Sequence, residues 1–183
     1  DEYAVVGTDL SLRNCPAEHT YEGAFNAGVR DCGSSQVFAK IDSTLRGNPV
    51  EFVCGLQDGL NISSAIVAPS FPRYGRLLVE GRMRGCGKDG NGTDLCDGFA
   101  SRGRRVTHVA TQPDATARIA AAIAQAETGI KDVIVADAST ALDLLVVAAA
   151  VANANRSVLV AGSGGIAEAL AGSSPATAIS APR

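Results

Sequence analysis

Residues 40–48, KIDSTLRGN, carry a dense set of polar side chains that could bind a small anionic molecule. Lys40 and Asp42 lie two residues apart on a predicted strand, so their side chains share one side of it. Arg46 can donate two hydrogen bonds to a carboxylate, and Lys40 adds a point charge. Asp42 can accept a proton or orient an alcohol. The side chains that can recognise substrate hydroxyls are those of Ser43, Thr44 and Asn48.

This set of groups suits a small polyhydroxy acid or a phosphate ester better than an apolar ligand. A helix is predicted to begin after Asn48, and its free N–H groups would add to the attraction for an anion. The alternative interpretation is a well-capped turn that is held by its own salt bridge.

Carboxylates also follow other predicted strands. Asp9, Asp42 and Asp137 each stand at the end of an apolar run. In open α/β sheets ligands bind beyond the carboxyl ends of the strands, so these residues are expected to share one rim. Strand-end aspartates can also cap the helix that follows, and this interpretation is favoured for Asp137. For Asp9 both interpretations stay open.

Two further segments could reach the same rim. The turn Gly162-Ser163-Gly164-Gly165 lies between a predicted strand and a predicted helix, which makes it a candidate anion site. It has neither the full dinucleotide fingerprint nor the lysine of a P-loop, and glycine could serve only to make the turn tight. Two prolines stiffen the loop of residues 69–76, which ends at Arg76. Arg76 could reach the rim or could be a solvated loop charge.

The composition limits the class of protein. The chain has 183 residues, of which 46% are hydrophobic and 19% charged, as expected for a soluble globular domain. A net charge of -3 argues against nucleic acid as a partner, and no stretch is apolar enough to span a membrane. Five cysteines without CxxC or zinc-finger spacing indicate reduced thiols and a cytoplasmic location. His19 and His108 have no partners at ligand spacing, so no metal site is predicted.

Short apolar runs alternate with helical patterns along the chain. This alternation predicts an α/β fold, a three-layer, open, mostly parallel sheet with helices on both faces. A small antiparallel excursion is expected at residues 76–84, and a glycine-rich loop at 85–98. The predicted strands are 3–8, 36–41, 64–68, 106–110, 132–137 and 157–162. The predicted helices are 16–30, 49–60, 115–127, 141–153 and one that starts near Gly165.

Four segments resemble motifs of the four-carbon acid sugar kinase family. KIDSTLRGN resembles the Lys-x-Asp-Ser-Thr-x-Arg-Gly-Asn stretch of the family's N-terminal, substrate-binding domain. VVGTD at 5–9 looks like its strand ending in Thr-Asp, and APSFPRYGR at 68–76 resembles its Ala-Pro-x-Phe-Pro-x-x-Gly-Arg loop. GSGGIAEALAG at 162–172 is similar to its Gly-Ser-x-Gly-Leu-Ala stretch. The segments follow the family's order and cover nearly the whole chain.

The resemblance implies an enzyme that uses ATP and Mg to phosphorylate a terminal hydroxyl of threonate, erythronate or 3-oxo-tetronate. Residues 1–172 would form the sugar-acid-binding domain, and 173–183 would be a linker or tail. Asp42 would orient or deprotonate the attacking hydroxyl. The residues that would bind the substrate are Lys40, Ser43, Thr44, Arg46, Asn48, Asp9, Arg76 and Ser163. The glycines that would bind phosphate or another anion are Gly162, Gly164 and Gly165.

The chain departs from the family pattern in three places. The family begins with a strand and an Asp-Asp-x-Thr-Gly motif upstream of residue 1, and its nucleotide-binding domain would follow residue 183. The chain is therefore expected to be a catalytically incomplete fragment, and a homodimer could cover the sheet edge left by the missing strand. Where members often have Thr-Asp-Ser-Arg, this chain has Thr-Asp-Leu-Ser-Leu-Arg, so the resemblance assigns no role to Arg13. The alternative function is a non-catalytic sugar-acid or anion-binding module.

Overall fold

The computed structural model describes residues 7–31, 36–85 and 93–173. Its main sheet has five parallel strands in the order β1-β7-β2-β6-β5, and β3 and β4 form a separate antiparallel pair. The strands are β1 (Phe38–Lys40), β2 (Ser64–Ala68), β3 (Leu77–Val79), β4 (Arg82–Arg84), β5 (Arg105–Val109), β6 (Asp132–Ala136) and β7 (Val158–Gly162).

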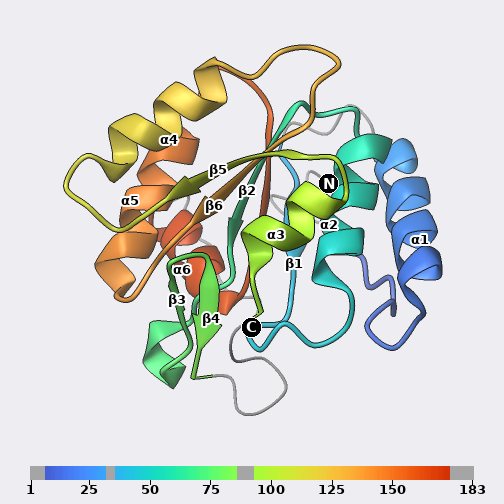
Figure 1. The fold of residues 1–183 in the computed structure, drawn as a ribbon, viewed down its shortest axis with the longest axis horizontal. Coiled ribbons are helices and arrows are strands. Elements are labelled where there is room, and N and C mark those ends of the chain that lie inside the picture. The colour runs from blue at the N-terminus through green and yellow to red at the C-terminus, as the bar shows by residue number, and fades with distance from the viewer. Residues whose placement is uncertain (1–6, 32–35, 86–92, 174–183) are drawn as a thin grey trace, which may run out of the picture.

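Six α-helices accompany the sheet in the described residues, and Figure 1 shows them in two groups, α1–α3 on one side and α4–α6 on the other. The helices are α1 (Ala17–Arg30), α2 (Pro49–Gly59), α3 (Leu95–Ser101), α4 (Ala115–Ala124), α5 (Ala141–Ala152) and α6 (Gly164–Ser173), with a 3-10 turn at Pro72–Tyr74. The predicted α/β class, with helices on both faces and a small antiparallel excursion, is confirmed.

The order of the strands explains the two helix layers. The connections through α2 and α3 lead from β1 to β2 and on to β5, away from the β1 edge. Those through α4 and α5 return from β5 to β6 and then to β7. A right-handed crossover that reverses its direction along the sheet must place its helix on the opposite face. The reversal at β5 therefore puts α4 and α5 on the face opposite to α2 and α3.

The structure corrects the loop predicted at 85–98 and tests only part of the strand predicted at 3–8. The predicted loop at 85–98 contains the beginning of α3, because buried Leu95 and Phe99 fix this helix against the sheet, and Asp94 caps its first turn. The predicted strand at 3–8 lies largely outside the described residues, and described Gly7 and Thr8 are not in a strand.

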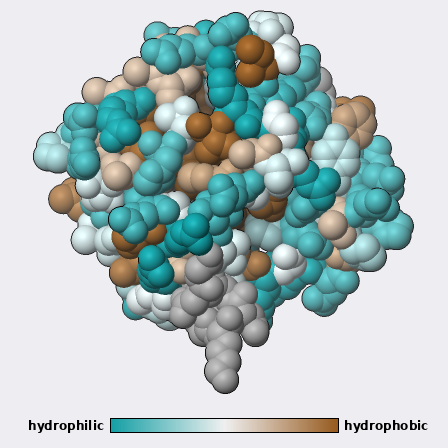
Figure 2. Space-filling model, in the orientation of Figure 1, coloured by the Kyte–Doolittle hydropathy of each residue, from teal (hydrophilic) through white to brown (hydrophobic). Residues whose placement is uncertain are grey.

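The core lies on both faces of the sheet. In β2, Ala65 and Val67 pack on the α1–α3 side, whereas Ile66 and Ala68 pack on the α4–α6 side. This is the alternation expected of a strand that is buried on both faces. By contrast, hydrophilic residues cover most of the surface visible in Figure 2, broken by small apolar patches.

Glycines allow α1 and α2 to approach closely. A Cβ added at Gly55 would collide with the carbonyl oxygen of Tyr21, and one at Gly59 would collide with that of Phe25. The backbones of the two helices are therefore in direct contact at these positions. This contact fixes where the segment before α1 meets the end of β1.

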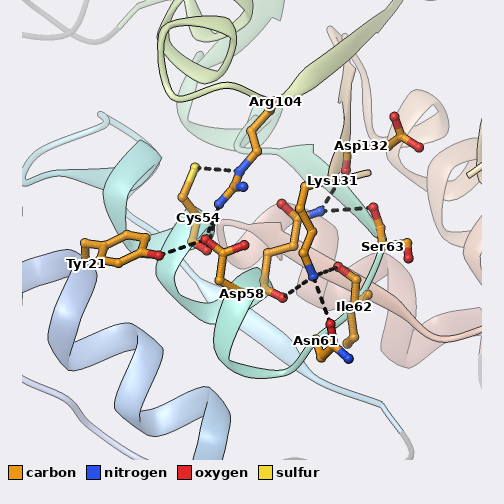
Figure 3. Close-up of polar contacts among 10 residues, drawn as sticks. Tyr21, Cys54, Asp58, Asn61, Ile62, Ser63, Arg104, Lys131 and Asp132 are labelled. Carbon is orange, nitrogen blue, oxygen red and sulfur yellow. Dashed lines mark hydrogen bonds and ion pairs between the residues drawn. The ribbon is translucent and has the colours of Figure 1, made fainter. Parts of the chain in front are cut away.

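A polar network joins the helices at the amino ends of the strands (Figure 3). Arg104 Nη2 lies 2.6 Å from Asp58 Oδ2, and the Tyr21 hydroxyl donates to the same oxygen at 2.9 Å. Arg104 also donates from Nε to Cys54 Sγ at 3.3 Å. Burial and the hydrogen bond to Asp58 raise the pKa of Tyr21 above its usual value of 10.0. The network links α1, α2 and the start of β5.

Two long side chains, those of Lys131 and Gln57, complete the end of α2. Lys131 Nζ donates to the carbonyl oxygens of Gln57 and Ile62 at 3.4 and 3.2 Å, which satisfies acceptors that the helix leaves open. Burial lowers the pKa of Lys131. The Gln57 amide donates to the carbonyl oxygens of Ser63 and Asp132 at 3.3 and 2.9 Å, so it ties α2 to β2 and β6.

No helix in the described part of the chain is both long enough and apolar enough to cross a bilayer.

The Asp58–Arg104 pair gives a stability test. We expect Asp58→Asn to lower the free energy of unfolding by about 2–3 kcal/mol, because it leaves a nearly buried guanidinium without its carboxylate. The control is Glu127→Gln, which removes an exposed partner of Arg105 and should cost less than about 0.5 kcal/mol. Urea unfolding followed by circular dichroism measures both, and equal losses would contradict a structural role for the pair.

Candidate functional site at the carboxyl end of β1

The turn that follows β1 has a fixed backbone. The Ile41 N–H donates to the Gly162 carbonyl at 2.9 Å, and the Leu45 N–H donates to the Asp42 carbonyl at 2.9 Å. Gly47 has φ +85°, a left-handed conformation that favours glycine, and a Cβ there would lie 2.7 Å from the Arg13 carbonyl oxygen. The turn is therefore joined to β7 on one side and packed against the segment before α1 on the other.

Asp42 is the centre of this turn. Its carboxylate accepts hydrogen bonds from the Thr44 N–H at 2.8 Å and the Thr44 hydroxyl at 2.9 Å, and from Arg46 Nε at 2.8 Å. Burial opposes its charge, but the hydrogen bonds from Thr44 and Arg46 outweigh burial and hold the pKa of Asp42 below its usual 3.8. Asp42 is therefore an ionised acceptor at neutral pH.

Three arginines from separate segments meet at the turn. Arg46 contacts Asp42 directly, and Arg13 Nη2 lies 3.8 Å from the same carboxylate. Their side chains are 63% and 59% exposed, so both guanidinium groups also face solvent. Arg76 donates from Nη1 to Ser43 Oγ at 2.6 Å. This arrangement places two exposed guanidinium groups beside the Asp42 carboxylate, whose side chain is 7% exposed, and a third beside the buried Ser43 hydroxyl.

The sequence predicted Arg46 and Arg76 for the site but gave no role to Arg13. The spacing between Asp9 and Arg13 differs from that of the family motif, and nothing in the local sequence indicates a contact between Arg13 and residue 42. In the structure the Asp9 carboxylate accepts from the Ser11 N–H at 2.8 Å, and Ser11 has φ 52°. This local turn leads the chain back so that Arg13 faces Asp42.

Two predicted binding residues are engaged within the protein. Lys40 is exposed, and its Nζ donates to the Ile41 carbonyl at 2.9 Å. Asn48 stands at the N-cap position of α2, as expected, but its side chain does not cap the helix. Its amide donates instead to the Cys15 carbonyl at 2.8 Å, so it joins the turn to the start of α1.

The glycine turn after β7 packs tightly against the loop that follows β2. A Cβ at Gly165 would lie 2.5 Å from the Ser70 carbonyl oxygen, and one at Gly164 would lie 2.8 Å from the Phe71 ring. Ser163 is fully buried, and its hydroxyl donates to the Ser70 carbonyl at 2.8 Å. Close packing thus explains why small residues occupy positions 163–165. It also explains Gly162, where an added Cβ would collide with Ile166. Their anion-binding role stays a prediction.

Asp137 does not cap the helix that follows it, contrary to the interpretation favoured from the sequence. Helix α5 begins with a capping box made by Thr140 and Asp143. The Asp137 carboxylate instead accepts from the N–H groups of Glu80 and Gly81 at 2.8 and 3.0 Å. It therefore binds the turn of the β3–β4 hairpin, a partner distant in the sequence that local reasoning could not find.

A small cavity lies at the other half of the rim, between α4 and α5. Its volume is about 30 Å³, which is enough to hold water. The lining residues are Val109, Thr111, Gln112, Ala115, Ile119, Ala136, Asp137, Asp143, Val146 and Val147. It shares no residue with the turn of residues 41–48.

Metal-ligating side chains are not clustered in the part of the chain that the structure describes. Within 7–31, 36–85 and 93–173, no three or more His, Cys, Asp or Glu side chains are grouped so as to hold a metal. At the glycine turn after β7, the Phe71 ring, Ile166 and the Ser70 carbonyl occupy the space that side chains at Gly164, Gly162 and Gly165 would need.

Comparison with known proteins agrees with the motifs. Residues 1–93 and 94–170 match a family model described as a sugar-binding N-terminal domain. The chain is 34% identical to a D-threonate kinase from Cupriavidus necator over 93% of this chain and 42% of that enzyme. It therefore spans less than half of the length of this relative.

Solved structures show the same fold. A domain of unknown function from Bordetella bronchiseptica, a domain-swapped dimer with bound citrate, has a TM-score of 0.70 at 24% identity over 88% of this chain and 43% of its own. A Haemophilus influenzae protein that belongs to the same family of unknown function as the Bordetella protein has a TM-score of 0.62 at 21% identity. The match covers 87% of this chain and 43% of the Haemophilus chain. The solved structures share the fold, and the family match with the D-threonate kinase relative shows that the chain belongs to the four-carbon acid sugar kinase family, in its sugar-binding N-terminal domain.

Proposed function

We propose that this chain is the substrate-binding part of an ATP-dependent kinase that phosphorylates a terminal hydroxyl of a four-carbon sugar acid. Its relative is a D-threonate kinase, so D-threonate is the first substrate to test, with erythronate and 3-oxo-tetronate as related candidates. The observation that carries the proposal is the meeting of Arg13, Arg46 and Arg76 at the turn of Asp42 and Ser43.

The groups at the turn have complementary tasks in this proposal. Arg46 and Lys40 hold the substrate carboxylate, since a guanidinium forms paired hydrogen bonds with it and an ammonium adds charge. Ser43 and Thr44 recognise hydroxyls of the sugar chain. Asp42, ionised and at the centre, orients or deprotonates the attacking hydroxyl. Catalysis then depends on positioning and on charge stabilisation.

The remaining predicted contacts belong to the edges of the same site. Asp9 and Asn48 hold the segment that carries Arg13 beside the turn. Ser163 supports the loop that leads to Arg76. We propose that residues 1–172 act as one binding domain in the cytoplasm, and that a homodimer forms as in the Bordetella relative.

ATP and Mg are proposed to bind to a part of the kinase that corresponds to the unmatched length of its relatives. The chain matches only 42% of the D-threonate kinase, which leaves more than half of that enzyme's length for a nucleotide-binding part. The activity of the chain alone is therefore proposed to be incomplete.

Removing the central cation should weaken binding. We expect Arg46→Ala to raise the Kd for D-threonate about tenfold or more, because a charge-assisted pair of hydrogen bonds is lost. Isothermal titration calorimetry on the 183-residue chain measures this change. Arg118→Ala, which removes an exposed arginine of α4, is the control and should leave the Kd unchanged. If neither the wild type nor Arg46→Ala binds D-threonate, the proposed substrate is wrong.

Catalysis gives a second test. The chain, mixed with Mg-ATP and D-threonate, should release no ADP above the background in a coupled assay, whereas a complete D-threonate kinase in the same assay should turn over. Substrate-dependent ADP release by the chain alone would refute the proposed need for a second domain and leave the family assignment intact.

The ionisation of Asp42 predicts a pH dependence of stability. Its folded-state pKa lies below the unfolded value of 3.8, so its stabilising contribution is present above that pH and is lost as pH falls through the folded pKa. The stability advantage of the wild type over Asp42→Asn should therefore be largest near neutral pH and shrink below about pH 4. Urea unfolding of both variants across pH 3–7 measures it, and a constant difference would contradict the assignment.

A further inference from the structure

We propose that Asp137 is a positioning residue for Arg76. Its buried carboxylate holds the β3–β4 hairpin at the carboxyl end of the sheet, and the hairpin in turn holds Arg76 at the sugar-acid turn. This inference rests on the proposed function, in which Arg76 lies beside the substrate. Asp137 acts through Arg76 and does not itself contact the substrate.

The hairpin turn requires support from outside. Glu80 and Gly81 connect β3 to β4 with φ values of 54° and 70°, the left-handed pair of a tight two-residue turn. Glycine adopts this conformation readily, but a glutamate does so at a cost. The two N–H groups of these residues donate to the two oxygens of Asp137 at 2.8 and 3.0 Å. The carboxylate therefore stabilises a turn that the sequence alone disfavours.

A histidine on the neighbouring strand faces the same carboxylate. His108 of β5 places Nε2 3.0 Å from Asp137 Oδ2, and the Asp137 side chain is only 6% exposed. Asp137 is thus enclosed between β5 and the hairpin. Its carboxylate belongs to the packing of the hairpin on the sheet and is not presented to solvent.

The residue after Asp137 attaches the hairpin a second time. Ala138 and Leu78 exchange backbone hydrogen bonds, both of 3.1 Å. The Ser70 hydroxyl donates to the Ala138 carbonyl at 2.8 Å and accepts from the Leu78 N–H at 2.8 Å. Residues 137–138, directly after β6, therefore fix both the first strand of the hairpin and its turn. Figure 1 shows the hairpin at one end of the sheet, outside the main strands.

Arg76 depends on this attachment because it directly precedes β3. Its carbonyl oxygen accepts from the Phe71 N–H at 2.7 Å, and its guanidinium extends to Ser43 beyond the end of β1. Arg46 and Asp42 belong to the β1 turn itself and do not use the hairpin. A displaced hairpin should therefore move Arg76 and leave the Asp42–Arg46 pair in place.

Strand β6 also supplies the control. Asp132, at its amino end, is a second buried carboxylate, and it pairs with Arg105 away from the site. Asp132→Asn should destabilise the fold without affecting Arg76. Asp137→Asn should affect both, so the two variants separate a positioning role from a purely structural one.

The experiment follows the Arg76 Nε–H signal in two-dimensional NMR of the ¹⁵N-labelled 183-residue chain, assigned by its loss in Arg76→Lys. We expect Asp137→Asn to shift or broaden this signal and to raise the Kd for D-threonate about tenfold. Asp132→Asn should change neither. In the Arg76→Lys background, Asp137→Asn should cause little further loss of affinity, because both changes remove the same interaction, that of the Arg76 guanidinium with the substrate.

An unchanged Arg76 signal in folded Asp137→Asn, or losses of affinity that simply add in the double variant, would overturn the proposal. If Asp137→Asn does not fold, Ser70→Ala removes the hydroxyl that bridges Ala138 and Leu78 in the second attachment of the hairpin, and it must shift the same signal. If the wild-type chain does not bind D-threonate, the proposed function fails, while the NMR comparison still decides whether Asp137 positions Arg76.

Discussion

Parallel pairing of the strands is the constraint on which the site depends. Because β1, β7, β2 and β6 run in one direction, their carboxyl ends meet at one edge of the sheet. Asp42, Ser163, Ser70 and Asp137 are far apart in the sequence but follow these four strands. Each of their side chains bonds to a neighbouring loop or to its own turn. Hydrogen bonds between neighbouring loops therefore fix this edge of the sheet, and Arg46 and Arg76 extend from two of these loops.

The sequence predicted the fold well because its signals are local and periodic. Continuous apolar runs gave β2 with its observed bounds, and Pro49 placed the start of α2. Buried strands and helix starts are set by neighbouring residues, so one sequence is enough to find them. Helix α3 was missed because its glycine- and aspartate-rich surroundings indicate a loop, whereas burial of Leu95 and Phe99 stabilises the helix.

The side-chain partners at the rim could not be predicted in the same way. The segment of residues 40–48 indicated the candidate site, but Asn48 bonds to Cys15 and Asp137 bonds to Gly81, across large distances in the sequence. Such choices depend on which loops the topology brings together. Arg13 shows the same limit, since the local turn at Asp9 and Ser11 and the packing of its backbone on Gly47 together bring it to Asp42.

The contact between α1 and α2 affects the candidate site from a distance. Gly59 is the last residue of α2, yet any larger side chain there must push α1 away from its neighbour. Since Arg13 lies just before α1, a shift of this helix would also act on the segment that holds the Arg13 guanidinium near Asp42. The arrangement of charges at the candidate site therefore depends on a buried helix crossing as well as on the side chains of the turn.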